Sequence, residues 1–162
     1  MEAAKKKLSK ALSHNFYWDA REWAYKHVKP CVFAEVYMDD ESHDELLDYK
    51  VFTFLGKPSI IQVDFDRFTS HKRNLYDTSW NFINAIIQYP NEANTLIEKP
   101  QVLDEILELA QTLSEGLTHV RVDFYLINNK VYFGEMTFYH GGGYESFSHD
   151  ELALYMGKQI VL

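Results

Sequence analysis

The alternation of apolar and polar positions predicts helical structure at the start of the chain. In residues 3–25, Leu8 and Leu12 recur at helical spacing, and the neighbouring lysines fall largely on the other side. This pattern predicts one helix, or two helices in succession. Proline lacks a backbone N–H, so Pro30 ends the helical region. The apolar run of residues 31–38 then predicts a buried strand.

Strand patterns dominate the middle of the chain. The acidic stretch of residues 39–45 predicts a solvated loop. Two β-rich runs, 48–55 and 59–65, flank a short stretch of turn residues and together predict a β-hairpin. Residues 66–100 contain a basic cluster and predict a loop with strand fragments. The basic cluster consists of Arg67, His71, Lys72 and Arg73.

Helix and strand patterns follow each other to the end of the sequence. Residues 102–113 carry apolar side chains at helical spacing and predict a helix that ends near Gly116. Two strands are predicted next, at 120–127 and 131–138, and a short helix at about 148–157. These elements predict an α+β fold with a mostly antiparallel sheet and helices packed on one face.

Length, composition and charge restrict the fold and the function. A chain of 162 residues with 46% hydrophobic residues suffices for one compact domain, which we divide into a helical segment (1–29) and a lobe (30–162). The formal net charge of −8 argues against nucleic-acid binding. Cys31 is the only cysteine, which favours a reducing compartment, and no apolar run reaches the ~20 residues that span a bilayer. We therefore expect a cytoplasmic protein without a membrane span.

Three charged residues interrupt the last two predicted strands. Arg121 and Asp123 share a strand face, because side chains alternate with a period of two. A two-residue turn would place Glu135 opposite Val122, on the other face. A three-residue turn with a left-handed asparagine pairs Asp123 with Glu135 and Arg121 with Thr137. We favour the three-residue turn, because it makes one face a site and the other a core.

In that register the charged face suits a metal–phosphate site. The opposite, apolar face would carry Val122, Phe124, Leu126, Tyr132, Met136 and Phe138. Two adjacent carboxylates repel each other unless a cation lies between them, and Mg²⁺ prefers oxygen ligands. Arg121 would then contact phosphate. The alternative is a structural ion pair between Arg121 and Asp123, with Glu135 at a wet edge. The pattern alone leaves both interpretations open.

The motifs of this hairpin resemble those of a known enzyme family. Arg121-Val-Asp-Phe124, a turn, and Tyr132-Phe-Gly-Glu-Met-Thr-Phe138 resemble the pattern that closes an ATP-grasp active site. With Gly141-Gly-Gly-Tyr-Glu-Ser-Phe147, the string looks closest to the TupA-like ATP-grasp family, which is associated with teichuronopeptide and other cell-surface polysaccharide biosynthesis. Upstream motifs fall in the family's order: Arg21-Glu-Trp-Ala-Tyr25, Ala34-Glu-Val-Tyr-Met38, Asp48-Tyr-Lys50, Phe54-Leu-Gly-Lys-Pro58 and Tyr76-Asp-Thr-Ser-Trp80.

The resemblance implies ATP and Mg²⁺ as cofactors and assigns roles to single residues. Asp123 and Glu135 would hold Mg²⁺, and Arg121 would contact the transferring phosphate. Asp48 would take the ribose hydroxyls, and Lys50, which shares its strand face, would be a second catalytic cation. The backbone of a hinge strand, with Glu35, Tyr37 and Met38, would bind adenine, and Arg73 would clamp phosphate.

For several of these residues, a purely structural role is the alternative. Glu35 would instead form a hinge ion pair, and Asp48 a strand-end turn. Each basic residue of the 66–73 region, Arg73 included, would belong to a solvated loop. His140 is either a general base or a solvated loop residue. The glycines 141–143 either let an acceptor or phosphate approach the backbone or bend the chain into its last helix.

The sequence also departs from the family pattern. General ATP-grasp enzymes have asparagine where this chain has Thr137, so a hydroxyl replaces a coordinating amide oxygen. The N-terminal half of the family, with its phosphate-covering loop, has no counterpart here. We therefore expect a truncated copy, a catalytically silent fragment, or one subunit whose partner chain supplies that lobe.

The resemblance implies an ATP-grasp ligase in polysaccharide biosynthesis of the cell envelope. ATP would phosphorylate a carboxylate, and an amine would capture the acylphosphate to form an amide on a polysaccharide or aminoacyl precursor. One alternative is a glycosyltransferase of the same pathway, which would bind a nucleotide sugar through a metal-bridged diphosphate. The other is a non-catalytic binding module derived from the ATP-grasp fold.

Overall fold

The computed structural model describes residues 2–38 and 46–161. Contacts divide the chain into two compact units, and the boundary along the sequence lies between Tyr37 and Met38. The solvated loop predicted for residues 39–45 lies outside the described residues.

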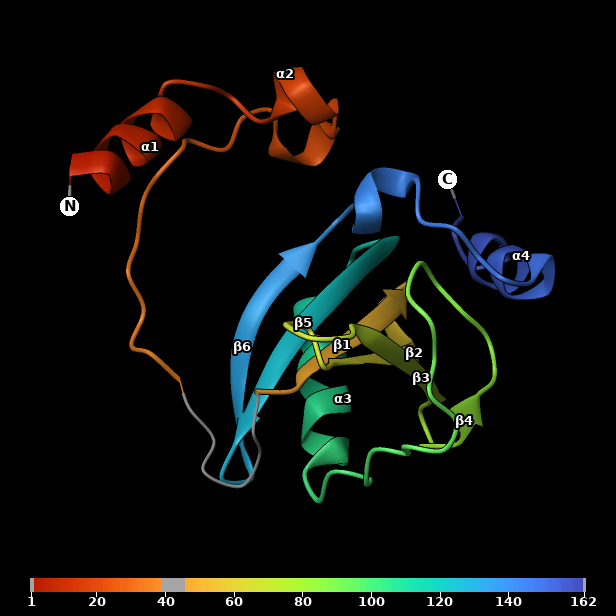
Figure 1. Cartoon of the computed structure of the whole chain (residues 1–162). Helices are drawn as coiled ribbons and strands as arrows, with labels where there is room; N and C mark the ends of the chain where they lie inside the picture. The colour runs from red at the N-terminus through yellow and green to blue at the C-terminus, as the bar shows by residue number, and fades with distance from the viewer. Residues whose placement is uncertain (1, 39–45, 162) are drawn as a thin grey trace. The chain divides into compact units, whose positions relative to one another are not determined.

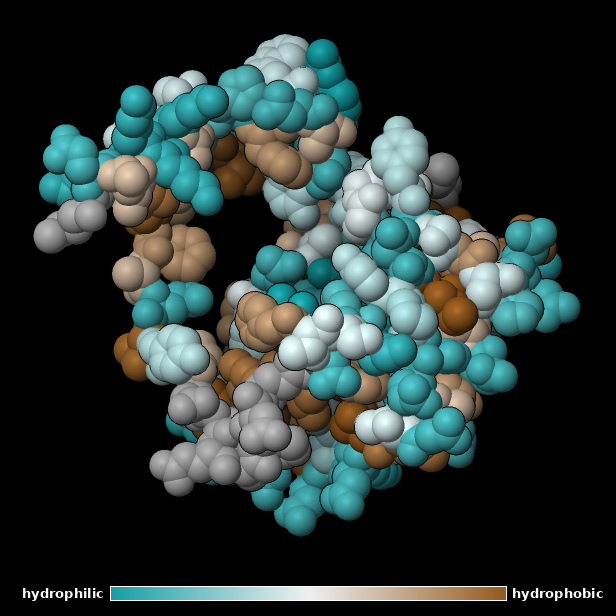
Figure 2. Space-filling model, in the orientation of Figure 1, coloured by the Kyte–Doolittle hydropathy of each residue, from teal (hydrophilic) through white to brown (hydrophobic). Residues whose placement is uncertain are grey.

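The first unit is a succession of short helices (Figure 1). It contains α1 (Glu2–Leu12), α2 (Tyr17–Ala20) and the 3₁₀ helix η1 (Trp23–Tyr25), which confirms the prediction of consecutive helices. No described residue of this unit is buried, and Figure 2 shows both hydrophobic and hydrophilic side chains at its surface.

The buried strand predicted for residues 31–38 is wrong. Residues 31–37 are exposed and belong to no strand, and Met38 is half-buried. An apolar run becomes a buried strand only where a neighbouring strand takes up its backbone hydrogen bonds. None of the sheet's strands pairs with this described segment.

The second unit contains a six-stranded sheet in the order β4-β3-β2-β1-β5-β6, and every pair is antiparallel (Figure 1). The predicted α+β class with an antiparallel sheet is therefore confirmed. The 48–65 hairpin and the strand fragments after it are confirmed as well. The strands are β1 (Asp48–Phe54), β2 (Lys57–Phe65), β3 (Lys72–Asp77), β4 (Phe82–Ile83), β5 (His119–Ile127) and β6 (Lys130–Thr137).

One face of the sheet packs against α3 (Leu103–Leu113), the helix predicted at 102–113. Leu103, Ile106 and Ala110 of α3 enter a buried cluster with the apolar side chains of the central strands. The strands contribute Tyr49, Val51, Ile61, Val63, Tyr76, Val120, Val122 and Phe124. Because side chains alternate along a strand, the intervening residues of β1, β2 and β5 point to the other face.

That other face is apolar at one end only. Phe52, Leu75 and Met156 belong to a second buried cluster, to which the 83–87 segment adds Ala85 and Ile87. Met156 comes from α4 (Asp150–Lys158), which confirms the predicted last helix. The apolar end holds the C-terminal segment against the sheet and leaves the rest of this face to polar side chains.

The β5–β6 hairpin pairs Asp123 with Glu135 and Arg121 with Thr137, as predicted. The three-residue turn that we predicted as the cause of this register is wrong. Asn128 and Asn129 form a two-residue turn with φ of 52° and 59°, and a bulge after Asp123 leaves Gly134 as the extra residue. The bulge supplies the one-residue shift that we had assigned to the turn.

The bulge also changes which side chains line the core. Tyr132, predicted on the apolar face, pairs with Tyr125 and is not part of the core. Val131 packs against the core instead. Between the turn and the bulge the strands keep the register of a two-residue turn, so the β6 side chains of this stretch lie on the face opposite to the predicted one, whereas those of β5 do not change.

Gly134 is expected to be intolerant of a side chain. A Cβ at this position would lie 3.0 Å from the backbone oxygen of Asp123 and 3.1 Å from Cε2 of Tyr125. Gly134→Ala should lower the free energy of unfolding by about 1–2 kcal/mol, measured by urea denaturation. As a matched control, Gly157→Ala in α4 meets nothing within 4 Å and should be neutral or stabilising. Equal effects of the two changes would contradict the close packing at the bulge.

Candidate functional site

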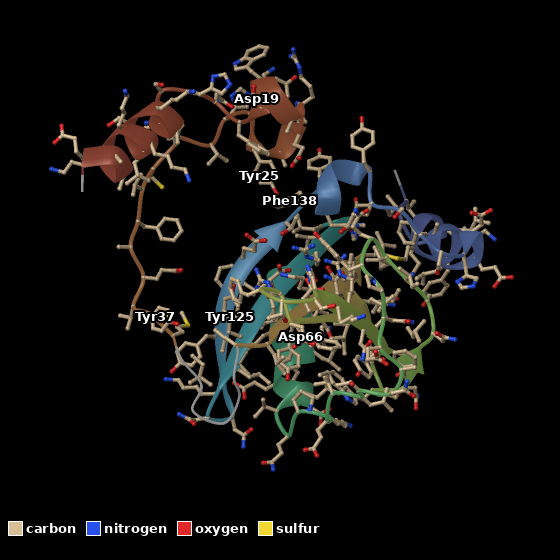
Figure 3. All side chains as sticks on the ribbon, in the orientation of Figure 1. Asp19, Tyr25, Tyr37, Asp66, Tyr125 and Phe138 are labelled. Carbon is tan, nitrogen blue, oxygen red and sulfur yellow. The ribbon has the colours of Figure 1, made fainter. Side chains whose placement is uncertain are left out.

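Charged side chains line the polar part of the face that points away from α3 (Figure 3). On β1, Asp48 lies opposite Asp64 of β2, and Lys50 lies opposite both Gln62 of β2 and Asp123 of β5. All five residues are buried. Burial of charge is costly unless each charge is paired, so the arrangement of partners decides what this surface can do.

Asp123 lies at the centre of the first group of charges. Arg121 donates two hydrogen bonds to it, from Nε to Oδ1 at 2.8 Å and from Nη2 to Oδ2 at 2.7 Å. Lys50 Nζ donates a third to Oδ2 at 2.6 Å. Although burial alone would lower the pKa of Arg121, these bonds to Asp123 raise it above its ordinary value. The predicted site residues Lys50, Arg121 and Asp123 are thus brought together.

Lys50 also joins Asp48 to this group. Its Nζ lies 2.5 Å from Asp48 Oδ2, and Arg67 Nη1 lies 3.0 Å from the same oxygen. Burial raises the pKa of Asp48 above its ordinary value, although Lys50 acts in the opposite direction. The second oxygen of Asp48, Oδ1, is buried and has no hydrogen-bond partner among residues 2–38 and 46–161. Asp48 therefore has one acceptor that no described residue occupies.

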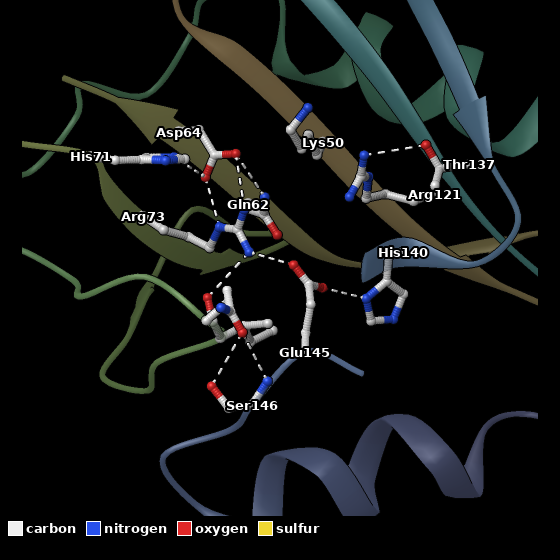
Figure 4. Close-up of polar contacts among 12 residues, drawn as sticks. Lys50, Gln62, Asp64, His71, Arg73, Arg121, Thr137, His140, Glu145 and Ser146 are labelled. Carbon is white, nitrogen blue, oxygen red and sulfur yellow. Dashed lines mark hydrogen bonds and ion pairs between the residues drawn. The ribbon is translucent and has the colours of Figure 1, made fainter. Parts of the chain in front are cut away.

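Glu135 lies at the open edge of the group. Its side chain is 64% exposed, and its Oε1 lies 3.4 Å from Nη2 of Arg121. Thr137 donates a hydrogen bond to the same oxygen at 3.0 Å. Thr137 also accepts one from Arg121 at 3.2 Å (Figure 4). Arg121 thus contacts both carboxylates. These contacts correspond to the structural ion pair with a wet edge that the sequence left open as an alternative.

Asp123 and Glu135 are of the ligand type that Mg²⁺ binds. Asp123 and Glu135 place two carboxylates on paired positions, and Mg²⁺ in proteins takes one or two carboxylates and completes its shell with water and phosphate. The guanidinium of Arg121 now contacts both of them, so a metal would replace one of its contacts. In residues 2–38 and 46–161, no three His, Cys, Asp or Glu side chains form a metal cluster.

A second group of charges is centred on Arg73 of β3 (Figure 4). Its Nε and Nη2 donate to the two oxygens of Asp64 at 2.7 and 3.1 Å. Its Nη1 donates to Glu145 Oε1 at 2.9 Å and to the backbone oxygen of Ile87 at 3.1 Å. The solvated-loop alternative is wrong for Arg73, because Arg73 is buried in a strand.

Glu145 ties the C-terminal segment to this group and was missed by the sequence analysis. His140 Nδ1 lies 2.6 Å from Glu145 Oε2, so the solvated-loop interpretation of His140 is also wrong. A Cβ on Gly141 would lie 2.1 Å from Cγ of Glu145. The first of the three glycines therefore leaves room for the Glu145 side chain. A charged residue two positions after a glycine run was the only available signal, and it does not identify a partner.

Glu145 should make folding sensitive to acid. Burial alone would raise its pKa, but hydrogen bonds from His140 and Arg73 outweigh burial and lower the pKa from 4.5 to about 2. A carboxyl with a lowered pKa contributes stability that is complete above the unfolded value and is lost as pH falls toward the folded value. We expect a loss of about 2 kcal/mol between pH 4.5 and 2, after allowance for solvent screening.

Urea unfolding at a series of pH values measures this effect. Glu145→Gln should be less stable than the wild type at neutral pH, and the difference should shrink on acidification. The exposed Glu151 of α4 provides a matched control, since Glu151→Gln should not change the slope in this range. A difference between wild type and Glu145→Gln that is independent of pH would contradict the assignment.

The residues predicted to bind adenine are not part of either charged group. Glu35 and Tyr37 are exposed and Met38 is half-buried, and all three lie outside the strands. The prediction of a hinge strand is therefore wrong, whereas a role of their backbone in binding adenine stays a prediction.

No helix in the described parts of the chain is long and apolar enough to cross a membrane.

The family model described as TupA-like ATPgrasp matches residues 1–161, nearly the whole chain. No curated protein and no solved structure matches the chain significantly.

Proposed function

The chain belongs to the TupA-like ATP-grasp family, and from this membership and the charged sheet face we propose that it binds ATP with Mg²⁺ for a ligase reaction. In that reaction a carboxylate attacks the γ-phosphorus of ATP and forms an acylphosphate, with ADP as the leaving group. An amine then attacks the acyl carbon and releases phosphate, which leaves an amide. The family's association with polysaccharide biosynthesis suggests a polysaccharide or aminoacyl precursor as the substrate.

The observation that carries the proposal is the pair of buried cations around Asp123. Lys50 and Arg121 are held on adjacent strands by one carboxylate, so both are fixed before any ligand arrives. Preorganised cations stabilise the negative charge that spreads over a transferring phosphoryl group. We therefore assign contact with the phosphate to Arg121 and Lys50.

Magnesium would be held by Asp123 and Glu135. When bound, it would neutralise phosphate charge and help to hold the nucleotide in place. Competition for the carboxylate oxygens would release N–H groups of Arg121, which then become available to phosphate. The exposed Glu135 gives the ion access from solvent, and Thr137 would orient Glu135 through its hydroxyl.

The remaining assignments follow the family resemblance. Asp48, whose Oδ1 has no partner among the described residues, would accept hydrogen bonds from the ribose hydroxyls. The backbone near Glu35, Tyr37 and Met38 would bind adenine. Arg73 is less suited to clamp phosphate than Arg121 is, because four hydrogen bonds already occupy its guanidinium.

The reaction class is tested by product analysis. We expect ADP release from ATP that requires Mg²⁺ and increases when an amine acceptor is added with a carboxylate donor. Hydroxylamine serves as a general amine probe, because it traps an acylphosphate as a hydroxamate. Release of a nucleoside diphosphate from a nucleotide sugar, with none from ATP, would instead favour the glycosyltransferase alternative.

A non-catalytic binding module is the second candidate, and one observation favours it. Both oxygens of Asp123 are already satisfied by protein cations, so the group is stable without metal or nucleotide. Such a module would show no ADP release under any of these conditions. Binding of Mg²⁺ and nucleotide without turnover would identify a module that retains the site.

A further inference from the structure

We propose that the N-terminal unit, residues 1–37, binds the surface of an anionic lipid bilayer. This inference goes beyond the proposed nucleotide chemistry and does not depend on it. The unit has no buried residue of its own in its described part, so its apolar side chains have no interior in which to pack. Large apolar groups that remain exposed together mark a surface for a partner.

The charge of this unit differs from that of the rest of the chain. Residues 1–37 contain seven Lys and Arg against four Asp and Glu, whereas residues 38–162 contain nine against twenty. The N-terminal unit is therefore basic, although the net charge of the whole chain is −8. A basic segment is attracted to anionic headgroups, each Lys or Arg contributing about 1 kcal/mol near the surface.

The lysines of α1 are arranged around an apolar stripe. Leu8 and Leu12 lie one turn apart on one side, at 44% and 43% exposure, and Lys6 and Lys10 lie on the opposite side. Lys5 and Lys7 flank the stripe. Lysines that flank an apolar stripe can extend their charged ends toward headgroups while the leucines enter the acyl boundary.

Aromatic residues and cations continue this character beyond α1. Trp18 and Trp23 are 57% and 68% exposed. The guanidinium of Arg21 lies 5.2 Å from the centre of a Trp18 ring, and Lys26 Nζ lies 5.3 Å from that of Tyr17. Tryptophan and tyrosine beside cations are typical of segments at the membrane–water interface.

A lipid surface explains this combination better than other partners do. Nucleic acid would use the lysines, but it offers nothing to the leucine stripe of α1. A second copy of the unit would cover the leucines but would bring lysines of like charge together. An anionic bilayer satisfies the lysines, the leucines and the tryptophans at once.

Vesicle co-sedimentation of the full chain tests the proposal. We expect binding to vesicles of phosphatidylcholine mixed with phosphatidylglycerol and little binding to phosphatidylcholine alone. Changing Lys5, Lys6, Lys7 and Lys10 to Gln should lower the partition coefficient about tenfold or more. Gln has a helix propensity close to that of Lys, so α1 should persist.

Two further variants complete the test. The matched control changes four exposed lysines of the second unit, Lys57, Lys99, Lys130 and Lys158, to Gln and should bind as the wild type does. Leu8→Gln with Leu12→Gln should also weaken binding, because it removes the stripe while retaining the charge. Equal binding to both kinds of vesicle would overturn the proposal. So would an equal loss in the control, or a dimer in solution that the leucine variant dissociates without any vesicle binding.

Discussion

Replacing Asp123 by asparagine is expected to lower the free energy of unfolding by about 3–5 kcal/mol. The asparagine has nearly the same shape, so packing is retained and the change is electrostatic. Lys50 and Arg121 both donate to the Asp123 carboxylate in a buried position, and the variant leaves two buried cations without that partner. Breaking a buried pair by removing one member costs much more than a surface pair contributes.

Urea denaturation of the two proteins measures this loss. Asp104 lies exposed in the first turn of α3, and Asp104→Asn should change stability by less than about 1 kcal/mol. A loss in Asp123→Asn no larger than that of the control would contradict the central position of Asp123. The same substitution should also abolish nucleotide binding, and unchanged affinity in a folded variant would refute the metal-site assignment.

Replacing Glu135 by glutamine should have the opposite profile, with a large effect on binding and a small one on stability. Glu135 is mostly exposed and makes one long contact with Arg121, so its loss should cost less than about 1 kcal/mol. As a proposed magnesium ligand, however, it should be required for metal-dependent nucleotide binding. We expect the affinity for an ATP analogue with Mg²⁺ to fall by about tenfold or more.

The matched control for this change is Glu108→Gln. Glu108 is exposed on α3, which packs against the opposite face of the sheet, so the variant has the same change of charge away from the site. Nucleotide affinity should be unchanged in the control. A similar loss in both variants would show a general effect of charge and would contradict a role for Glu135 as a ligand.

In the β5–β6 hairpin, the sequence predicted which residues pair at the site, but not the backbone feature that produces this pairing. Alternation of apolar and charged residues is strong enough to identify the pairing of Asp123 with Glu135, because only that pairing separates a core from a charged face. It does not distinguish a longer turn from a bulge, since both shift the register by one residue. Gly134 was the local signal, and a glycine inside a strand often marks a bulge.

Other features depend on partners far away in the sequence. Arg73 belongs by sequence to a basic cluster of no fixed structure, and only the fold brings it to Asp64 and to Glu145, 72 residues away. The apolar run of residues 31–38 has the composition of a strand, yet a strand also needs a neighbour to pair with. Local pattern therefore predicted the helices and hairpins, and missed the contacts made between distant segments.

The central claim, that this charged face binds nucleotide together with Mg²⁺, is tested most directly by isothermal titration of the full chain with a non-hydrolysable ATP analogue. The account predicts binding that saturates at one nucleotide per chain when Mg²⁺ is present and becomes at least about tenfold weaker when it is removed. Affinity that is the same with and without Mg²⁺, or the absence of binding in both conditions, would contradict it.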